Sequence, residues 1–334
     1  MSLKALVRQQ AQQTQQALKL GPPMHLPTPL VRSDALSAAA GCRVWLKLEN
    51  LQPTGSFKLR GLGAACQLRV AMGATRLVSS SGGNAGMAVA YAGRALGVPV
   101  LVVVPVTTSE RARRRIAAYG ATVVVQGAAW HEAHAHALAL MQPGDALLHP
   151  FDDPELWAGH ASLVDELALQ AAFVPDAVVL AVGGGGLLAG VAEGLDRQGW
   201  MSMPVIAVET EGADALNCAV LAGERVSLDA VRSVAMSLGA RQVCERAFEL
   251  TQTHAVTAVK VSDAQAVAAC LRFLDDHHML VEPACGAALA VAYDGVLAGL
   301  SPRDNVVIVV CGGVTASLEE LQQWQLDLSS IASD

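Results

Sequence analysis

Residues 177–188 read AVVLAVGGGGLL, and this stretch decides the class of fold. Its first half is apolar without alternation, which is typical of a strand that is covered on both faces. Four glycines follow, and the Ala- and Leu-rich segment after them predicts a helix over Leu187–Arg197. A strand, a glycine turn and a helix in this order indicate a βαβ unit with parallel strands.

The same order of strand, turn and helix recurs along the chain. Val-rich runs predict strands at Arg76–Ser79, Val100–Val104, Ala177–Val182, Val205–Val208 and Asn305–Val310. Further helices are expected over Gly86–Leu96, Ser109–Tyr119, Ala128–Met141, Ala213–Ala222 and Asp263–Asp276, the last of them capped by Ser262 or Asp263. We therefore expect an α/β fold with two open sheets, parallel or mixed, and helices on both faces of each sheet.

Length and composition indicate an ordered protein of about two domains. The chain has 334 residues, of which 52% are hydrophobic and 16% are charged, and this composition argues against disorder. A segment around residues 143–154 is rich in Pro and Asp and is the best candidate for a domain boundary. The net charge of −7 leaves no basic surplus that would bind a nucleic acid.

Targeting and cysteine patterns favour a cytoplasmic protein. No apolar run approaches the roughly 18 residues of a membrane span. The Gln-rich N-terminal segment lacks the apolar centre of a signal peptide. The seven cysteines are odd in number and form no CxxC pair, so neither a disulfide framework nor a zinc ribbon is expected. Most of them are expected to be small buried side chains.

Gly183, Gly184, Gly185 and Gly186 form the first candidate site. Glycine lets a backbone approach a ligand closely. The N–H groups and the dipole at the start of a helix favour an anion, most often a phosphate. The spacing fits neither the GxGxxG nor the Walker motif. A tight turn without a ligand is the alternative interpretation.

Residues 54–61, TGSFKLRG, form the second candidate site. Ser56 is a candidate helix cap, which would place Lys58 in the first helical turn. The positive end of the helix dipole disfavours the ammonium form there. The neutral amine that a Schiff-base lysine requires is then more accessible. A solvated lysine is the alternative interpretation when the residue is considered alone.

Three further segments carry polar or sulfur-containing groups. In SSSGGNAG, residues 79–86, small residues leave N–H groups free for a carboxylate, and an ordinary loop is the alternative. Cys311 follows a predicted strand at the end where open α/β sheets bind their ligands, and one more buried thiol is the alternative. The helix with His131, His134 and His136 lacks the HExxH spacing, so we interpret these residues as a solvated face.

Together these segments resemble the pyridoxal-phosphate enzymes of fold type II, the tryptophan synthase β-like family. Six motifs stand in the order found in the mammalian-type L-serine/L-threonine dehydratases of this family: SFKLRG, SSGGNAG, FDDPELWAGHAS, VGGGGLLAGV, VEPACGAALA and VVCGG. The resemblance covers residues 27–317. It implies a large domain over 1–59 and 151–334, a small domain over 60–150, and a cofactor in the cleft between them.

The resemblance also implies roles for individual residues. Lys58 resembles the lysine that binds pyridoxal 5'-phosphate covalently. The other implied cofactor-binding residues are Phe57, Asn84, Gly183, Gly184, Gly185, Gly186, Leu187 and Cys311, with the glycines on the phosphate and Cys311 facing the pyridine nitrogen. The implied substrate-binding residues are Ser80, Ser81, Gly82, Gly83, Asn84, Ala85 and Phe151. The implied ligands of a monovalent cation, K+ or Na+, are Glu209, Ala213, Ser237 and Leu238.

The activity that the resemblance implies is β-elimination on L-serine or L-threonine, which releases ammonia and pyruvate or 2-oxobutyrate. Cys311 is a weak donor and acceptor, so the pyridine nitrogen is expected to stay largely neutral. Gly82 is a departure, because the most active dehydratases carry Ala there and related racemases carry Ser. We therefore expect little racemase activity and looser positioning of the substrate.

Other functions stay open at this point. The chain could be another fold-type-II enzyme, such as a racemase or a β-replacement synthase, or a pyridoxal-phosphate-binding protein with little catalytic activity. A nicotinamide dehydrogenase is disfavoured because GxGxxG is missing. The expected partners are a small amino-acid substrate and a second copy of the chain in a homodimer, without nucleic acid or membrane.

Overall fold

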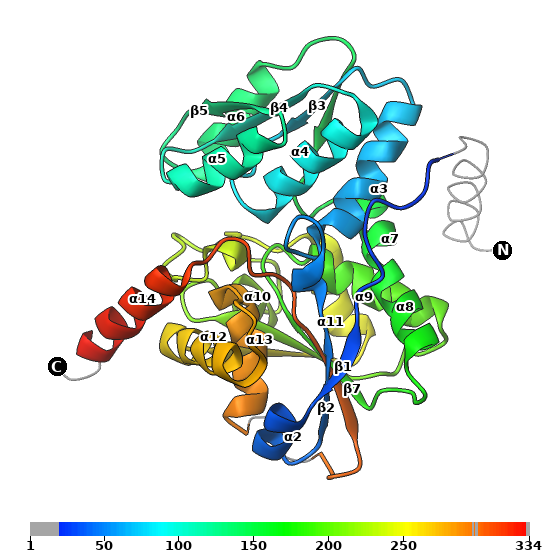
Figure 1. Cartoon of the computed structure of the whole chain (residues 1–334), viewed down its shortest axis with the longest axis vertical. Helices are drawn as coiled ribbons and strands as arrows, with labels where there is room; N and C mark the ends of the chain where they lie inside the picture. Colours follow the sequence, from blue (N-terminus) through cyan, green and yellow to red (C-terminus); the bar gives the residue numbers. More distant parts are fainter. Residues whose placement is uncertain (1–19, 296, 298–299, 332–334) are drawn as a thin grey trace. The chain divides into compact units, whose positions relative to one another are not determined.

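Short apolar strands build two sheets, one in each of the two units into which the chain divides by its contacts (Figure 1). The computed structural model describes residues 20–295, 297 and 300–331. The first unit contains Lys58–Pro150 and the described residues up to His25. The second contains Leu26–Phe57 and the described residues from Phe151 onward. Each unit is an α/β structure of its own, which confirms the predicted fold class.

The first unit has a four-stranded parallel sheet in the order β5-β4-β3-β6. Its elements are α3 (Lys58–Ala71), β3 (Arg76–Ser79), α4 (Asn84–Leu96), β4 (Val100–Val104), α5 (Glu110–Ala118), β5 (Thr122–Val125), α6 (Trp130–Ala139) and β6 (Asp145–Leu148). Helix α6 packs on β3 and β4 through Ala133 and Ala137. Helix α4 contacts the same two strands and is flanked by α3 and α5 (Figure 1).

The second unit has a six-stranded sheet in the order β1-β2-β10-β7-β8-β9, in which only β1 runs antiparallel to its neighbour. The strands are β1 (Leu30–Ser33), β2 (Arg43–Lys47), β7 (Ala177–Ala181), β8 (Val205–Thr210), β9 (Val256–Val261) and β10 (Asn305–Val309). In the register, Val306 of β10 lies opposite Val44 of β2 on one side and Ala177 of β7 on the other.

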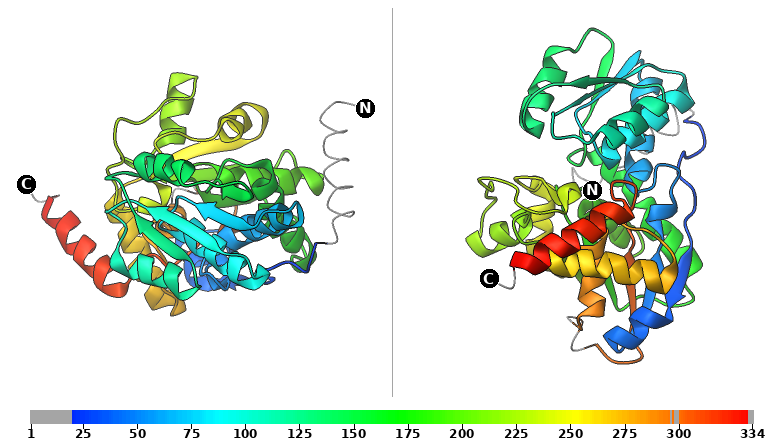
Figure 2. Two further views of the ribbon diagram at one scale, coloured as in Figure 1. Left: turned by 90° about the horizontal axis from the view of Figure 1, so that it is seen from above. Right: turned by 60° about the vertical axis from the view of Figure 1, so that its left-hand side comes forward.

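Helices cover both faces of this second sheet. The helices are α2 (Asp34–Ala40), α7 (Pro154–His160), α8 (Ser162–Gln170), α9 (Gly186–Arg197), α10 (Ala215–Ala222), α11 (Glu245–Thr253), α12 (Asp263–His277), α13 (Pro283–Tyr293) and α14 (Leu318–Ile331), with the 3-10 turns η1 (Glu49–Leu51) and η2 (Met236–Leu238). Helix α13 packs on the sheet beneath α12, and α9 packs on it together with α7, α8 and α11. Figure 2 shows α14 lying against α12 at the surface.

Local sequence explains why these elements form. Strand β7 is apolar and buried at every position, as the unbroken hydrophobic run predicted. Helix α13 is rich in Ala and is buried along its whole length, because small side chains let it lie close to both the sheet and α12. Ser262 caps α12 in a capping box with Gln265, which confirms the predicted start of this helix.

The contacts divide the chain beside Lys58, slightly before the boundary between residues 59 and 60 that the resemblance implies. The division falls between Phe57 and Lys58, because α3 begins at Lys58 and a helix stays in one unit. Residues 20–25 also belong with this helix, since Gln67 donates hydrogen bonds to the carbonyls of Gly21 and Pro22. The functional division into 1–59 with 151–334 and 60–150 stays a prediction. None of the described helices is both long and apolar enough to span a membrane.

Candidate active site

Lys58 is the first residue of α3, so the predicted position in the first helical turn is correct. Its Nζ atom donates a hydrogen bond to the main-chain carbonyl of Pro150 at 2.6 Å. The side chain is half-buried. The structure therefore presents a primary amine at a helix start and orients it with a carbonyl acceptor.

Ser56 does not cap this helix, which corrects the prediction. Its Oγ atom is buried and has no hydrogen-bond partner among the described residues. The main chain of this segment pairs instead with the segment after β10. The Phe57 amide donates to the Cys311 carbonyl at 3.0 Å, and the Gly313 amide donates to the Gly55 carbonyl at 3.1 Å. This pairing fixes Phe57, the residue before Lys58, beside Cys311.

The predicted substrate loop lies at the carboxyl end of β3, in the first unit. Ser80 is fully buried, Ser81, Gly82 and Gly83 are partly exposed, and Asn84 and Ala85 begin α4. The first turn of a helix has N–H groups without intrahelical acceptors. The loop therefore combines hydroxyl groups with N–H groups that an anion such as a carboxylate can accept from.

The space beside Gly82 is occupied by the side chain of Thr108, and the looser positioning of the substrate stays a prediction. A Cβ atom on Gly82 would lie 2.4 Å from Oγ1 and 2.5 Å from Cγ2 of Thr108. Such distances are far inside van der Waals contact. The Thr108 side chain, which follows β4, therefore fills the volume that a side chain at position 82 would take.

His134 does not lie on a solvated face, which corrects a second prediction. Its Nδ1 atom is 2.9 Å from Oγ of Ser80, and its ring stacks on Trp130 with the centroids 5.0 Å apart. Burial lowers the pKa of His134, so the neutral imidazole predominates at neutral pH. The structure thus adds a histidine to the predicted substrate loop.

The four glycines join β7 to α9 in the second unit, with Gly183 and Gly184 partly exposed and Gly185 and Gly186 buried. A Cβ on Gly184 would lie 2.3 Å from the ring of Phe151, and one on Gly186 would lie 2.7 Å from the Phe151 carbonyl oxygen. Gly185 has φ +93°, a conformation that favours glycine. Side chains are thus excluded here, and the first turn of α9 offers its N–H groups to an anion.

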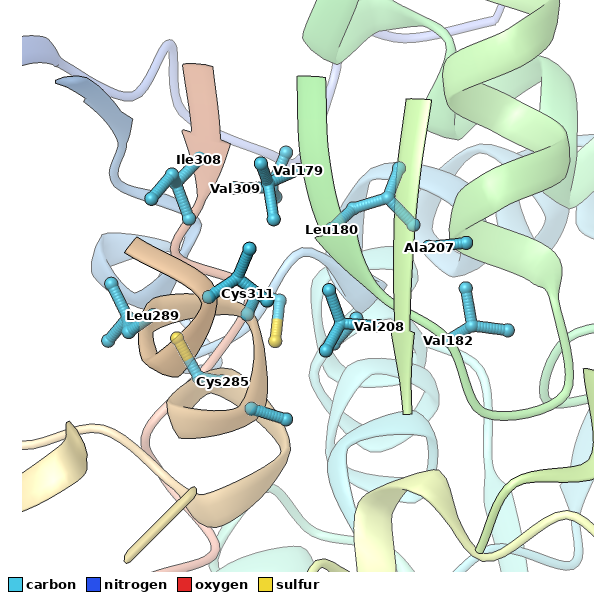
Figure 3. Close-up of a cluster of buried hydrophobic side chains, with 14 of the residues drawn as sticks. Val179, Leu180, Val182, Ala207, Val208, Cys285, Leu289, Ile308, Val309 and Cys311 are labelled. Carbon is cyan, nitrogen blue, oxygen red and sulfur yellow. The ribbon is translucent and has the colours of Figure 1, made fainter. Parts of the chain in front are cut away.

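Leu187 is buried in α9, directly after this loop. Cys311 is buried just after the end of β10. Figure 3 shows Cys311 and Cys285 among aliphatic side chains of the sheet and of α13. A hydrogen bond with Cys285 and burial hold the pKa of Cys311 well above its ordinary value. Cys311 is therefore a neutral thiol, as the interpretation of a weak donor and acceptor requires.

The four residues predicted to bind a cation lie at two places in the second unit. At the end of β8, the Glu209 carboxylate accepts hydrogen bonds from the amides of Leu216 and Asn217, which begin α10. Burial raises the pKa of Glu209 to about 7. Ala213 is buried in the same turn, and its amide donates a hydrogen bond to the Thr210 carbonyl.

Ser237 and Leu238 belong to η2 and lie against the glycine loop. A Cβ on Gly183 would be 3.0 Å from Cα of Leu238 and 3.1 Å from the Ser237 carbonyl oxygen. Among the described residues, no group of three or more His, Cys, Asp or Glu side chains could hold a metal ion. A monovalent cation held by carbonyl groups stays a prediction.

These groups suit pyridoxal phosphate chemically. The glycine loop suits a phosphate, because Gly184, Gly185 and Gly186 have no room for a Cβ and the first turn of α9 leaves N–H groups for an anion. The amine of Lys58 fits the aldehyde, and the neutral thiol of Cys311 fits a pyridine nitrogen that carries no proton.

The chain belongs to the family of pyridoxal-phosphate dependent enzymes, because the model of that family matches residues 22–312. It is 49% identical over 315 residues to "Serine dehydratase-like" of Rattus norvegicus, which covers 92% of this chain and 96% of that protein. It is 47% identical over 311 residues to "L-serine dehydratase/L-threonine deaminase" of Homo sapiens, which covers 90% and 95%. The crystal structure of a fungal L-serine ammonia-lyase from Rhizomucor miehei matches with a TM-score of 0.87 at 39% identity, covering 91% and 98%.

Sequence reasoning missed three residues of this region: Thr108, His134 and Cys285. A signal existed for Thr108, because residues 107–108 closely follow the carboxyl end of a parallel strand, where ligands of open sheets bind. Cys285 stood in a quoted motif, but nothing in that motif indicates its contact with Cys311. His134 gave no signal, since its contact with Ser80 joins residues 54 positions apart.

Proposed function

We propose that the chain is an L-serine/L-threonine ammonia-lyase that uses pyridoxal 5'-phosphate. The observation that carries the proposal is the position of Lys58. This lysine begins α3 directly after Phe57, and the amide of Phe57 is bonded to the carbonyl of Cys311. The identity of 47% to a protein named L-serine dehydratase/L-threonine deaminase supports the choice of substrates.

Each group has a task in this proposal. Pyridoxal phosphate supplies the electron-withdrawing ring that makes the Cα proton of an amino acid acidic. Lys58 would hold the cofactor through its Nζ amine, and the same amine, when neutral, would take the Cα proton of the substrate. The loop over Ser80–Ala85 would receive the substrate carboxylate, and the four glycines would hold the phosphate end of the cofactor. Asn84 would bind the ring hydroxyl, and the neutral thiol of Cys311 would leave the ring nitrogen without a proton.

The overall reaction balances without an oxidant or a second substrate. L-Serine loses its Cα proton and its β-hydroxyl as water, and the released 2-aminoacrylate takes up water to give pyruvate and ammonia. L-Threonine gives 2-oxobutyrate and ammonia in the same way. Position 82 carries no hydroxyl that could return a proton to the opposite face of Cα, so we expect racemisation to be slow.

The proposal also includes finer points that rest on the resemblance or, for the location, on the targeting and cysteine patterns of the sequence. These are a homodimer, a cytoplasmic location and a monovalent-cation site with Glu209, Ala213, Ser237 and Leu238. Sedimentation equilibrium tests the first of them, since the expected mass is twice that of the chain. A β-replacement synthase would need a second nucleophile, and a racemase would need a second proton donor.

The test is a panel of L- and D-amino acids with 2-oxo acid release as the readout. Wild type should release pyruvate from L-serine or 2-oxobutyrate from L-threonine, and D-serine should form at less than about one hundredth of that rate. Lys58→Ala should lose at least about 1,000-fold in kcat. Lys260→Ala, which removes a partly exposed lysine of the second unit, is the control and should keep the wild-type rate. Full activity of Lys58→Ala would refute the assignment.

A further inference from the structure

Ser80 and His134 form a hydrogen bond that none of the proposed roles uses. Oγ of Ser80 and Nδ1 of His134 are 2.9 Å apart, and both residues belong to the first unit. Ser80 is fully buried just after β3, whereas His134 is half-buried on α6, which packs on β3 and β4. The packing of α6 on β3 and β4 therefore places the His134 imidazole within hydrogen-bond distance of the Ser80 hydroxyl, in the predicted substrate loop.

The ring of His134 is held in one orientation by its neighbours. Trp130, one turn earlier on α6, stacks on it with an interplanar angle of 22°. His149 meets it edge-on, with the centroids 6.2 Å apart. His149 immediately precedes Pro150, and the carbonyl of Pro150 accepts the hydrogen bond from Lys58. A ring packed in this way cannot turn freely, so Nδ1 stays directed at Ser80.

The direction of the hydrogen bond between Ser80 and His134 decides whether the Ser80 hydroxyl can donate to a ligand. A neutral imidazole has one N–H group, and a serine hydroxyl has one proton. If His134 accepts that proton, Ser80 offers only lone pairs to a ligand, and these repel a carboxylate. If His134 donates instead, the hydroxyl proton remains for the carboxylate.

We propose that His134 is a positioning residue that donates its Nδ1–H to Ser80 Oγ and thereby directs the Ser80 hydroxyl proton toward the carboxylate of the amino-acid substrate. The inference rests on the proposed function for the identity of the carboxylate. It deepens that function by naming the residue that sets the polarity of the substrate-binding hydroxyl. His134 does not touch the substrate in this arrangement.

Nitrogen NMR of the holoenzyme with 15N-labelled histidine tests the proton position directly. The ring 15N shifts show which nitrogen carries the proton, and the signals that vanish in His134→Phe identify the residue. The expected result is a neutral ring protonated at Nδ1. A ring protonated only at Nε2 would overturn the proposal, and this readout does not depend on turnover.

Steady-state kinetics with L-serine test the consequence for binding. His134→Phe keeps an aromatic ring against Trp130 but cannot donate, and His134→Asn restores an N–H donor. We expect KM to rise about tenfold in His134→Phe with kcat within about twofold of wild type, because the interaction is made before and during the reaction alike. His134→Asn should stay within about threefold of wild type in KM.

His131→Phe is the matched control, because His131 lies on the same helix with its side chain 63% exposed. It should leave KM and kcat unchanged. An unchanged KM in His134→Phe, or equal losses in the Phe and Asn variants, would overturn the proposal. If wild type releases no 2-oxo acid from any amino acid, the proposed function fails and the carboxylate role fails with it, whereas the NMR result still decides the Ser80–His134 polarity.

Discussion

At the scale of single residues, the Thr108 side chain fills the volume that a side chain at position 82 would need. The Thr108 side chain reaches within 2.4 Å of the place where a Cβ at position 82 would lie. The two positions therefore cannot be altered independently, and Thr108 becomes part of the wall of the predicted substrate loop. The rate of the enzyme should depend on the pair and not on Gly82 alone.

We predict that Gly82→Ala and Thr108→Ala show strong non-additivity. Removing the Oγ1 and Cγ2 atoms of Thr108 opens the space that the new methyl group needs, so the double variant should differ from the sum of the single variants. A coupling of about 1 kcal/mol or more in kcat/KM for L-serine is expected from a contact this close. Additive effects within about 0.3 kcal/mol would contradict the arrangement.

The residue scale also shows what the sequence can and cannot predict. The glycine loop follows from the local sequence, because an apolar run, four glycines and a helical segment stand in this order. Lys58 lies in the first helical turn as predicted, but the cap at Ser56 on which that prediction rested is wrong. The contact between Ser80 and His134 does not follow from the local sequence, since it depends on how α6 packs on β3. The roles assigned to individual side chains stay predictions until the variants are measured.

At the scale of elements, the turn from β7 to α9 is constrained at every glycine. Gly185 has φ +93°, and a Cβ there would lie 2.3 Å from Cβ of Ala247 in α11. Gly199, which follows the other end of α9, also has positive φ at +74°, but nothing lies within 4 Å of a Cβ there. Both positions have positive φ, but only Gly185 lacks room for a Cβ, so a comparison of variants at the two positions separates backbone strain from steric exclusion.

Gly185→Ala should therefore weaken cofactor binding much more than Gly199→Ala. Both variants carry the strain of positive φ, which costs about 1–2 kcal/mol. Only Gly185→Ala also displaces the loop, so we expect the Kd for pyridoxal phosphate to rise at least about tenfold in this variant and to stay within about twofold in the control. Titration of the apoenzyme with the cofactor measures both values. Equal Kd values in the two variants would show that the loop does not hold the cofactor.

Strands β3 and β6 are joined at their start by an ion pair. Arg76 donates to both carboxylate oxygens of Asp145, with Nε to Oδ1 at 2.9 Å and Nη2 to Oδ2 at 2.5 Å. The Asp145 side chain is 3% exposed and the Arg76 side chain 26%. The hydrogen bond with Arg76 lowers the pKa of Asp145 below its ordinary value.

Asp145→Asn should lower the free energy of unfolding by about 1 kcal/mol at pH 7. The folded pKa of Asp145 lies below the unfolded value, so this contribution is present above about pH 4 and is lost as the pH falls through the folded pKa. Urea unfolding at pH 7 and at pH 3 measures the difference, which should shrink at the lower pH. Glu110→Gln, from an exposed pair with Arg114, is the control and should change stability by a few tenths of a kcal/mol. A difference that persists unchanged at pH 3 would argue against the ion pair.

Element boundaries were predictable where apolar runs end sharply. Strands β3 and β4 occupy the predicted residues, because Ser and Pro follow their buried runs directly. Helix α4 begins two residues before the predicted Gly86, since Gly83 serves as its N-cap residue. The cap at Ser56 failed for a different reason, because the main chain around it pairs with the segment after β10 and not with its own helix.

At the scale of the whole molecule, the second unit is built from segments far apart in the sequence. Strand β2 pairs with β10, which joins Val44 to Val306, and β10 in turn pairs with β7. Hydrophobic pattern predicted β7, β8 and β10 of this sheet but not β1, β2 and β9. It did not predict which strands are neighbours, since register and order depend on long-range contacts. The α/β class could therefore be predicted from the hydrophobic pattern, whereas the composition of each unit was implied only by the resemblance to a family.

The central claim is that Lys58 binds pyridoxal phosphate covalently through Nζ. Borohydride reduction of the holoenzyme fixes such a bond, and peptide mass mapping then locates the added pyridoxyl group. We expect the group on the peptide that contains Lys58, with none on Lys47 or Lys260. A pyridoxyl group on any other lysine, or a protein that takes up no cofactor after dialysis against it, would contradict the account.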